Sequence, residues 1–491
     1  MCIGRDGIPH NVRCDMLTDG KQDDVMRPYM VLSRRRGVRA PTLEFPIGKC
    51  DMYKNAYFAA TEPAIAEPAT SGDASEQTWE KRLEGPSPPR PNDQFDSGRI
   101  EHFPILVHCH LRWDFVWQRP QQIFTRLAAS HRIAYIEEPL PASARDAVAP
   151  RLQITEPQPN IVRIVPILPA SSANIEDQCA AVLALMRVAL LRHPLLRGQF
   201  EDPVQWFYSP MTAPSLLGEF GGQGVVYDCM DELANFRFAP ADIAAREQFL
   251  LSHADVVFTG GYQLFKSKSR HHDNVQFYGC GVDVAHFGRA QLAPTQVPTA
   301  VAQLPRPVFG YFGVIDERLD YPLIAGLAQT FPDASIVMAG PVVKVEQDQL
   351  PQLPNIHWLG QQSYDLLPNL VKGFDVCLMP FALNDATRYI NPTKTLEYMA
   401  AGKPVVSTAV ADVVRNFTPV VDVAGSHKEF FEAVDRAWRR PDPALIEEGV
   451  RRAQGASWTA TVKMMRGAVQ TALRASAGVA DAIAVQADAV R

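Results

Sequence analysis

The spacing of hydrophobic and polar positions changes repeatedly along the chain after residue 103. Short runs rich in β-branched and aromatic residues alternate with stretches in which apolar residues recur at helical spacing. Such alternation predicts an α/β protein with a parallel sheet that carries helices on both faces. The first series of predicted strands is 105–108, 132–138, 161–165, 204–208, 225–228 and 255–259, and its predicted helices are 118–130, 176–191 and 242–253.

A stretch rich in proline, glutamine and alanine, residues 291–307, interrupts the alternation, and a second series follows. We therefore predict two Rossmann-like domains, 100–290 and 308–457, joined by the linker 291–307. Ligands are expected at the carboxyl ends of the strands and in a cleft between the domains. The second series has predicted strands 308–313, 334–340, 355–360, 374–380, 405–408 and 420–423, and predicted helices 321–330, 364–372, 392–401, 428–439 and 443–454.

Both ends of the chain depart from this pattern. Residues 1–99 show no sustained period and include the proline-rich stretch 85–91, so we predict a largely disordered extension there. At the other end, residues 458–491 are predicted as a terminal helix, 459–475, that is followed by a frayed tail rich in alanine and valine.

Composition and charge narrow the classes of function. The 491 residues are 46% hydrophobic and 21% charged, which is typical of a soluble globular protein, and the net charge of −6 gives no reason to expect nucleic acid as a partner. The eight cysteines lack metal-type spacing, which favours reduced thiols. Since the longest apolar run, 180–191, is too short to span a bilayer and no secretory signal is apparent, we expect a cytoplasmic protein.

Residues 391–408 carry the most specific chemistry. Asn391 is expected to cap a helix that Gly402 ends, and a buried strand, 405–408, follows. Lys394 lies in the first turn, where a cation is disfavoured unless an anion binds there too, so the helix start predicts a phosphate site together with Thr393. Glu397 can accept hydrogen bonds from a vicinal diol such as ribose. The alternative is an exposed lysine–glutamate pair on an amphipathic helix.

Four further segments, together with 391–408, carry a resemblance to a known family. These segments are 110–122 (HLRWDFVWQRPQQ), 226–232 (VYDCMDE), 281–283 (GVD) and 310–313 (GYFG). Over roughly 103–475 the chain resembles the retaining GT-B glycosyltransferases, a group that includes bacterial exopolysaccharide, lipopolysaccharide and teichuronic-acid sugar transferases. The resemblance implies a GT-B fold, with the nucleotide sugar held by the C-terminal domain and the acceptor received by the N-terminal domain.

The segment 110–122 follows the first predicted strand, where ligand-binding loops of α/β proteins lie. Trp113 could stack on a sugar ring, while His110, Asp114 and Arg119 are candidates for contacts with acceptor hydroxyls or phosphates. The alternative is that Trp113 and Trp117 pack the helix onto the sheet and that Asp114 and Arg119 form a local ion pair.

Asp228 and Asp231 follow another predicted strand of the first series. Two carboxylates are too few for an oxygen cage, so we predict recognition of acceptor hydroxyls and no metal site. The alternative is that these aspartates cap the helix that follows.

The GYFG segment ends the first strand of the second series, and Gly313 permits a close approach of ligand to backbone. In the family that the chain resembles, a basic residue next to this glycine contacts the diphosphate; here Val314 stands there, so Arg318 is predicted in that role, with a solvated arginine as the alternative. Glu397 matches the second glutamate of the family's E-x₇-E pattern, but Tyr389 replaces the first. This departure leaves the handling of the donor sugar open, with Asn384 or Asp385 as substitutes.

The predicted function is transfer of a sugar from a nucleoside-diphosphate sugar to an acceptor hydroxyl, with retention and without metal or other cofactor. Lys394 and Arg318 are the predicted catalytic residues, because positive charge stabilises the departing diphosphate. The resemblance implies a glycan or lipid-linked acceptor in cell-surface glycan synthesis, and residues 191–197 suggest peripheral contact with the inner membrane face, or simply a helix end. Two alternatives remain, a GT-B sugar-nucleotide epimerase and a non-catalytic GT-B scaffold.

Overall fold

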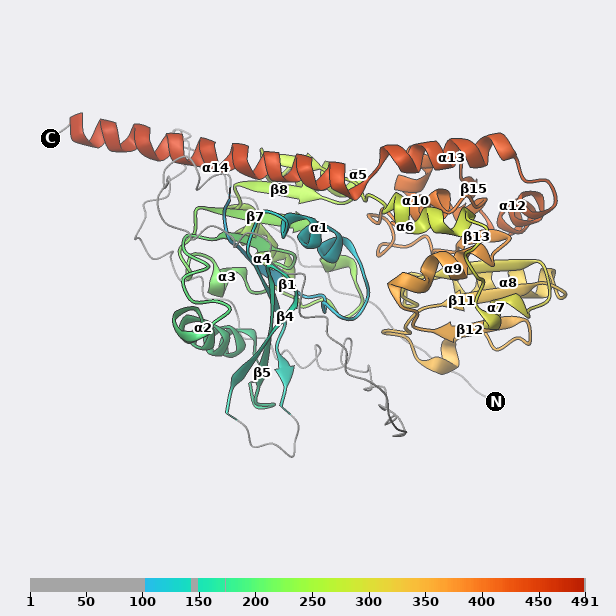
Figure 1. Cartoon of the computed structure of the whole chain (residues 1–491), viewed down its shortest axis with the longest axis horizontal. Helices are drawn as coiled ribbons and strands as arrows, with labels where there is room; N and C mark the ends of the chain where they lie inside the picture. Colours follow the sequence, from blue (N-terminus) through green and yellow to red (C-terminus); the bar gives the residue numbers. More distant parts are fainter. Residues whose placement is uncertain (1–101, 143–148, 173, 490–491) are drawn as a thin grey trace, which may run out of the picture. The chain divides into compact units, whose positions relative to one another are not determined.

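A computed structural model describes residues 102–142, 149–172 and 174–489, and it contains two parallel-stranded sheets (Figure 1). The first lobe comprises residues 102–281 and the C-terminal helix, and the second lobe comprises residues 282–455. The alternation of strands and helices predicted from the sequence is confirmed in both lobes. The predicted extension, residues 1–99, lies outside the described residues.

The first sheet has the strand order β3-β5-β2-β1-β6-β7-β8-β9, and β4 pairs with β5 in the antiparallel direction. The register places Ile105 opposite Ile133 and Val204, so β1 lies at the centre with fully buried side chains. The strands are β1 (Ile105–Cys109), β2 (Ile133–Glu137), β3 (Leu140–Pro141), β4 (Arg151–Gln158), β5 (Ile161–Leu168), β6 (Val204–Phe207), β7 (Gly224–Cys229), β8 (Val256–Thr259) and β9 (Val275–Phe277). The helices are α1 (Arg119–Leu127), α2 (Ile175–Arg192), α3 (Ala213–Leu216), η3 (Leu233–Asn235), α4 (Ile243–Leu251) and α5 (Tyr262–Lys268).

The second sheet is parallel and has the strand order β12-β11-β10-β13-β14-β15. The sequence of strands runs outward in opposite directions from β10 and from β13, and ligands of such sheets bind at the strand ends beside this switch point. Its strands are β10 (Val308–Phe312), β11 (Ser335–Ala339), β12 (Ile356–Gly360), β13 (Val376–Met379), β14 (Val405–Thr408) and β15 (Asp422–Ala424). Its helices are α6 (Val284–Gly288), η4 (Arg289–Gln291), α7 (Thr299–Ala302), α8 (Tyr321–Thr330), η5 (Gln347–Gln349), η6 (Tyr364–Leu366), α9 (Leu367–Lys372), α10 (Lys394–Ala400), α11 (Ala411–Phe417), α12 (His427–Arg439) and α13 (Pro443–Gly455).

The chain passes between the two lobes at two adjacent points. Val282 and Phe287 are buried in the core of the second lobe, so the chain enters that lobe ahead of the predicted linker 291–307. It returns at Trp458, where α14 (Trp458–Ala489) begins and packs against α1, β7 and β8 (Figure 1). A backbone bridge between Val282 and Ser457 joins the two crossing points.

Two local predictions differ from the structure. Helix α10 begins at Lys394 with Thr393 as its capping residue, so Asn391 is not the cap. The Asn391 side chain instead donates a hydrogen bond to the Gly260 carbonyl of the first lobe (2.9 Å), a long-range contact that local pattern cannot show. Helix α14 continues to Ala489 where a frayed tail was predicted.

Candidate active site

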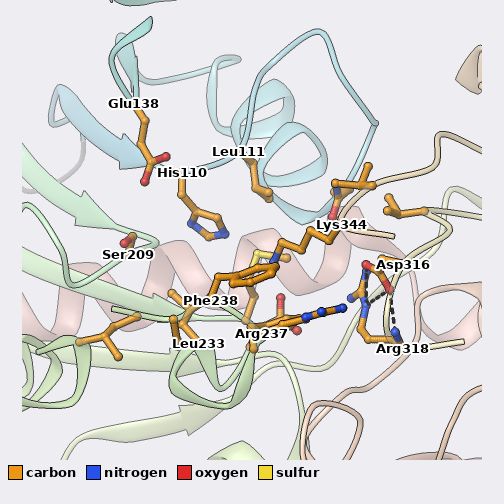
Figure 2. A pocket seen from close by; sticks show the side chains of 18 of the residues that line it. His110, Leu111, Glu138, Ser209, Leu233, Arg237, Phe238, Asp316, Arg318 and Lys344 are labelled. Atoms are coloured by element: carbon orange, nitrogen blue, oxygen red, sulfur yellow. Dashed lines mark hydrogen bonds and ion pairs between the residues drawn. The ribbon is translucent and has the colours of Figure 1, made fainter. Parts of the chain in front are cut away.

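A cavity of about 980 Å³, counted with its open mouth, is lined by residues of both lobes. Its lining residues follow strands β1, β2 and β7 of the first lobe and β10 and β11 of the second. Figure 2 shows His110, Glu138 and Ser209 towards one side of the view, and Asp316 with Arg318 towards the other. The carboxyl ends of the strands therefore form the site, as the alternating pattern predicts.

On the second-lobe side, two glycines let the backbone run close to the site. Gly313 has φ +148°, and a Cβ atom there would lie 2.6 Å from the Tyr311 hydroxyl and 3.1 Å from Cε of Lys394. Gly340 has φ +154°, and a Cβ atom there would lie 1.7 Å from the Gly313 carbonyl oxygen. Both positions thus require glycine, and Gly313 lies beside Lys394; its role in donor binding stays a prediction.

Lys394 and Glu397 form a pair beside this glycine. The Lys394 ammonium lies 3.3 Å from Oε2 of Glu397 and donates a hydrogen bond to the Thr393 hydroxyl (3.1 Å). The side chains are 17% and 9% exposed, so the pair is largely buried, and the alternative of an exposed surface pair is not what the structure shows. Among the described residues, the ion pair with Lys394 is the contact that Oε2 of Glu397 makes, and this oxygen is buried.

Arg318 lines the cavity and makes a two-pronged contact with Asp316 (Figure 2). Its Nε lies 3.0 Å from both carboxylate oxygens, and Nη2 donates to Oδ2 at 2.7 Å. The guanidinium is also 5.8 Å from the centre of the Phe236 ring. The Arg318 side chain is thus fixed by Asp316 and is not freely solvated. Its contact with a diphosphate stays a prediction.

Tyr389, which stands in the position of the missing glutamate, packs against the core of the first lobe. Its neighbour Asn391 is held by Gly260, as described above. Of the two suggested substitutes, Asn384 accepts a hydrogen bond from the Thr387 amide (3.2 Å), while the Asp385 carbonyl accepts one from the Asn235 side chain (3.1 Å). The segment 384–391, which is expected to bind the donor sugar, therefore contacts the first lobe at several points.

On the first-lobe side, His110 and Asp231 line the cavity as predicted for acceptor contacts. Burial lowers the pKa of His110 to about 4, with a further contribution from Lys344, so the imidazole is neutral at pH 7. Nδ1 of His110 is buried and has no hydrogen-bond partner among the described residues. Burial also raises the pKa of Asp231 to about 6, against the opposing charge of Arg318.

The other predicted acceptor residues lie elsewhere. Arg119 and Asp228 bind each other in the interior, with Nε of Arg119 3.0 Å from Oδ1 of Asp228 and the side chains 1% and 0% exposed. Trp113 is buried and packs edge-on against Tyr135 (5.0 Å between ring centres), so it belongs to the core, as the alternative interpretation of this segment holds.

Asp114 pairs with Arg163 and not with Arg119, so the local ion pair of that alternative is absent from the described residues. Neither Asp228 nor Asp231 caps the short helix η3, whose capping residue is Glu232. The predicted acceptor set is thus reduced, within the cavity lining, to His110 and Asp231.

Sequence reasoning missed several residues of the cavity wall, among them Glu138, Phe236 and Lys344. Burial raises the pKa of Glu138 to about 7. Glu138 directly follows strand β2, so the rule that ligands bind at strand ends would have found it. Phe236 lies 4.9 Å from the Lys344 ammonium of the other lobe, and nothing local in the sequence indicates that contact.

Two further features bear on ligands and location. No cluster of three or more histidine, cysteine or carboxylate side chains suited to a metal ion occurs in the described part of the chain. In the same part, every helix falls short of the length and apolar character that a membrane crossing demands. Residues 191–197 include the last turn of α2, with Leu191 73% exposed and Leu196 buried in the core.

Comparison with known proteins now identifies the second lobe. Residues 307–440 match the family described as glycosyl transferases group 1. The second lobe is therefore similar to the group 1 glycosyl transferases over these residues. This domain contains β10, Gly313, Arg318 and the Lys394–Glu397 pair.

A relative and two solved structures extend the likeness beyond this domain. A Bacillus subtilis (strain 168) protein, provisionally named a teichuronic acid biosynthesis glycosyltransferase (TuaH), is 26% identical over 250 residues, which is 47% of this chain and 62% of that relative. A trehalose-6-phosphate structure from E. coli, bound with UDP-2-fluoro glucose, has a TM-score of 0.55 at 15% identity and covers 75% of this chain and 99% of its own. Sucrose-phosphate synthase from Thermosynechococcus elongatus has a TM-score of 0.58 at 16% identity and covers 76% and 100%.

These similarities show the fold. The two parallel sheets, together with the group 1 domain and the match over whole solved chains, confirm the predicted GT-B architecture. The match to the Bacillus relative spans less than two thirds of that protein's length.

Proposed function

We propose that this protein transfers a sugar from a nucleoside-diphosphate sugar to an acceptor hydroxyl. The observation that carries the proposal is the buried Lys394–Glu397 pair beside Gly313, inside a group 1 glycosyltransferase domain. A cation in a largely buried position suits a diphosphate, and the carboxylate three residues further along the same helix suits the two ribose hydroxyls. The UDP-sugar bound to the E. coli structural neighbour is consistent with a donor of this class.

In this proposal the reaction proceeds by cleavage of the bond between the anomeric carbon and the diphosphate. The electron pair of that bond goes to the leaving phosphate oxygen, and Lys394 stabilises the charge that develops there. One well-placed donor of this kind is worth about 3–4 kcal/mol of transition-state stabilisation. Arg318 supplies a second positive charge when the diphosphate reaches it, competing with Asp316 for the guanidinium.

The acceptor hydroxyl then forms the new bond to the anomeric carbon. Its proton passes to the leaving phosphate oxygen, so transfer with retention requires neither a protein base nor a metal ion. His110 and Asp231 face the cavity from the first lobe and would orient the acceptor. Contacts between the lobes, such as the hydrogen bond from Gln122 Nε2 to the Tyr364 hydroxyl (2.9 Å), help to exclude water and so limit hydrolysis of the donor.

The acceptor belongs, in this proposal, to a cell-surface glycan or its lipid-linked precursor. The name of the Bacillus relative supports this assignment, because it refers to teichuronic acid biosynthesis. A cytoplasmic enzyme that works at the inner face of the membrane would meet both the nucleotide sugar and such an acceptor.

The test is product analysis. UDP, GDP, ADP and dTDP conjugates of glucose and of galactose are incubated with the protein and a panel of sugar acceptors, in the presence and absence of EDTA. Release of the nucleoside diphosphate with formation of a glycoside, unaffected by EDTA and with the donor's anomeric configuration by NMR, is expected. Conversion of the donor into its epimer without acceptor would instead establish the epimerase alternative, and a protein that neither binds nor converts any donor would be a scaffold.

Matched variants connect this activity to the site. Lys394→Ala is expected to lower turnover at least about 100-fold, since one stabilising donor is lost. Lys428→Ala is the control, because Lys428 is 87% exposed and pairs with Glu432 on the surface of the same lobe. Equal turnover by the two variants would refute the role of Lys394.

A further inference from the structure

A second cavity lies behind His110 in the first lobe. It measures about 440 Å³, counted with its opening, and it shares His110, Glu138 and Ser209 with the active-site cavity. Figure 2 shows these three residues near one another on the first-lobe side of the view. The two cavities are therefore adjacent, with a common wall or passage at His110.

The surface that the second cavity exposes is mostly apolar, although polar residues such as Glu137 and Gln178 also line it. Helix α2 contributes Ile175, Cys179 and Val182, the end of β2 contributes Ile136, and Leu216 comes from α3. Cys179 and Val182 are 2% and 4% exposed. Burial raises the pKa of the Cys179 thiol to about 12, so this wall carries no charge at neutral pH.

At the junction of the two cavities, His110 is neutral at pH 7 and Glu138 is partly protonated. Burial lowers the pKa of His110 to about 4 and raises that of Glu138 to about 7. Nδ1 of His110 has no hydrogen-bond partner among the described residues, although it is buried. Since a buried polar atom without a partner is costly, a ligand hydroxyl at this point would satisfy it.

We propose that the second cavity is an apolar subsite of the acceptor site, so that the acceptor carries a short alkyl or similarly apolar group next to the hydroxyl that His110 binds. This inference rests on the proposed transferase function and names the class of acceptor. The apolar group leaves water for the space between α2 and the end of β2, while the hydroxyl stays at the junction of the two cavities. An anionic substituent at the same position is rejected, because Glu137 and Glu138 line the cavity and no lysine or arginine is among its lining residues.

The size of the effect follows from the apolar wall. Each methylene group that moves from water into an apolar site gains about fourfold in affinity. The buried side chains of Cys179, Val182 and Leu216 close the inner end of the cavity, so the gain should stop after a short chain.

The probes are 1-alkanols from ethanol to 1-heptanol, because each offers one hydroxyl and one alkyl chain. Their dissociation constants are measured by saturation-transfer NMR on the full-length protein. We expect affinity to rise by roughly threefold to fourfold per methylene and then to level off. Affinity that does not depend on chain length would overturn the proposal.

Two tryptophan variants on one helix locate the effect. Val182→Trp fills the second cavity and should abolish the gain with chain length, whereas Val188→Trp, at a position that is 53% exposed, should keep it. Val182→Met is a milder filling variant whose fold is easier to retain, and it should shorten the limiting chain. The same chain-length dependence in all three variants would also overturn the proposal.

Failure of this inference can be told apart from failure of the proposed function. Binding of a nucleoside diphosphate is measured on the same wild-type protein by calorimetry. Nucleotide binding without any alkanol effect would overturn the subsite and leave the transferase proposal intact. An alkanol effect without nucleotide binding would establish the cavity as an apolar site and overturn its assignment to a transferase acceptor.

Discussion

The buried ion pair between Arg119 and Asp228 provides a sharp test of the structure. Sequence alone assigned both residues to acceptor binding, while the structure places both in the interior with side chains 1% and 0% exposed. Arg119 also donates a hydrogen bond from Nη1 to the Tyr278 carbonyl (2.9 Å) and so ties α1 to β7 and to the segment after β9. Asp228→Asn should therefore lower stability first, and activity only through stability.

The magnitude follows from burial. Removing one partner of a fully buried pair leaves an uncompensated charge, which costs about 3–5 kcal/mol. One kcal/mol corresponds to about 2–4 °C in melting temperature for a lobe of this size, so we expect a decrease of roughly 6–20 °C. The control is Asp114→Asn in the same lobe; Asp114 is 64% exposed and pairs with Arg163 at the surface, where such pairs contribute about 0–1 kcal/mol.

The assay is scanning calorimetry of the single variants and of the double variant Arg119→Met/Asp228→Leu. Replacing both charges by apolar groups removes the buried charge, so the double variant should melt at a higher temperature than Arg119→Met alone or Asp228→Leu alone. Melting temperatures of Asp228→Asn and Asp114→Asn that lie within 2 °C of each other would refute the buried pair. So would a double variant whose loss equals the sum of the single losses.

The remaining predictions concern pH and the glycine beside Lys394. Between pH 6.5 and 4 the protein should lose stability, because His108 and His131 are buried and have pKa values of about 4, below the unfolded value. Each histidine contributes about 3 kcal/mol to the free energy of unfolding, and this is lost as the pH falls through that window. His108→Phe should therefore reduce the loss of unfolding free energy at acid pH, as measured by urea titration. Glu138 has the opposite effect, because its pKa of about 7 lies above the unfolded value and stability therefore falls as the pH rises from about 5 to 8. Glu138→Gln should remove that fall, whereas the control Glu447→Gln, at an exposed position, should not. Gly313→Ala should weaken nucleotide binding by tenfold or more in calorimetry, since its Cβ meets the Tyr311 hydroxyl at 2.6 Å and Cε of Lys394 at 3.1 Å, and unchanged affinity would contradict the close approach seen there.

Much of the fold could be predicted from local pattern. Strands such as β1 and β10 are runs of buried apolar residues, and runs of that kind separated by amphipathic helices indicate parallel sheets without knowledge of distant contacts. The antiparallel strand β4 was missed. Its side chains are exposed or half-buried, so it lacks a run of buried apolar residues. It pairs with the following strand β5 in the antiparallel direction.

The candidate site could be predicted only in part. Lys394 and Glu397 are neighbours on one helix, so local spacing brings them together, whereas Gly313 reaches them from the end of strand β10. Arg119 and Asp228 are 109 residues apart, and only the tertiary structure shows that they pair in the interior. A strand-end position indicates that a polar side chain lies near the ligand edge, but it does not say whether that side chain points into the cavity or into the core.

The helix boundary at α10 shows a second limit of local reasoning. Asn391 and Pro392 form a good capping sequence, yet the helix begins at Lys394 with Thr393 as its capping residue. The Asn391 side-chain NH2 donates a hydrogen bond to the Gly260 carbonyl, a contact across 131 residues that local pattern cannot show.

The central claim is that a donor diphosphate binds beside Lys394 and Glu397. Calorimetric titration of UDP, GDP, ADP and dTDP into wild type, Lys394→Ala and Lys428→Ala tests it most directly. We expect at least one nucleotide to bind the wild type and Lys428→Ala equally, and to bind Lys394→Ala at least about tenfold more weakly, the equivalent of about 1.4 kcal/mol. Binding that is equal in all three proteins, or absent from all three, would contradict the account.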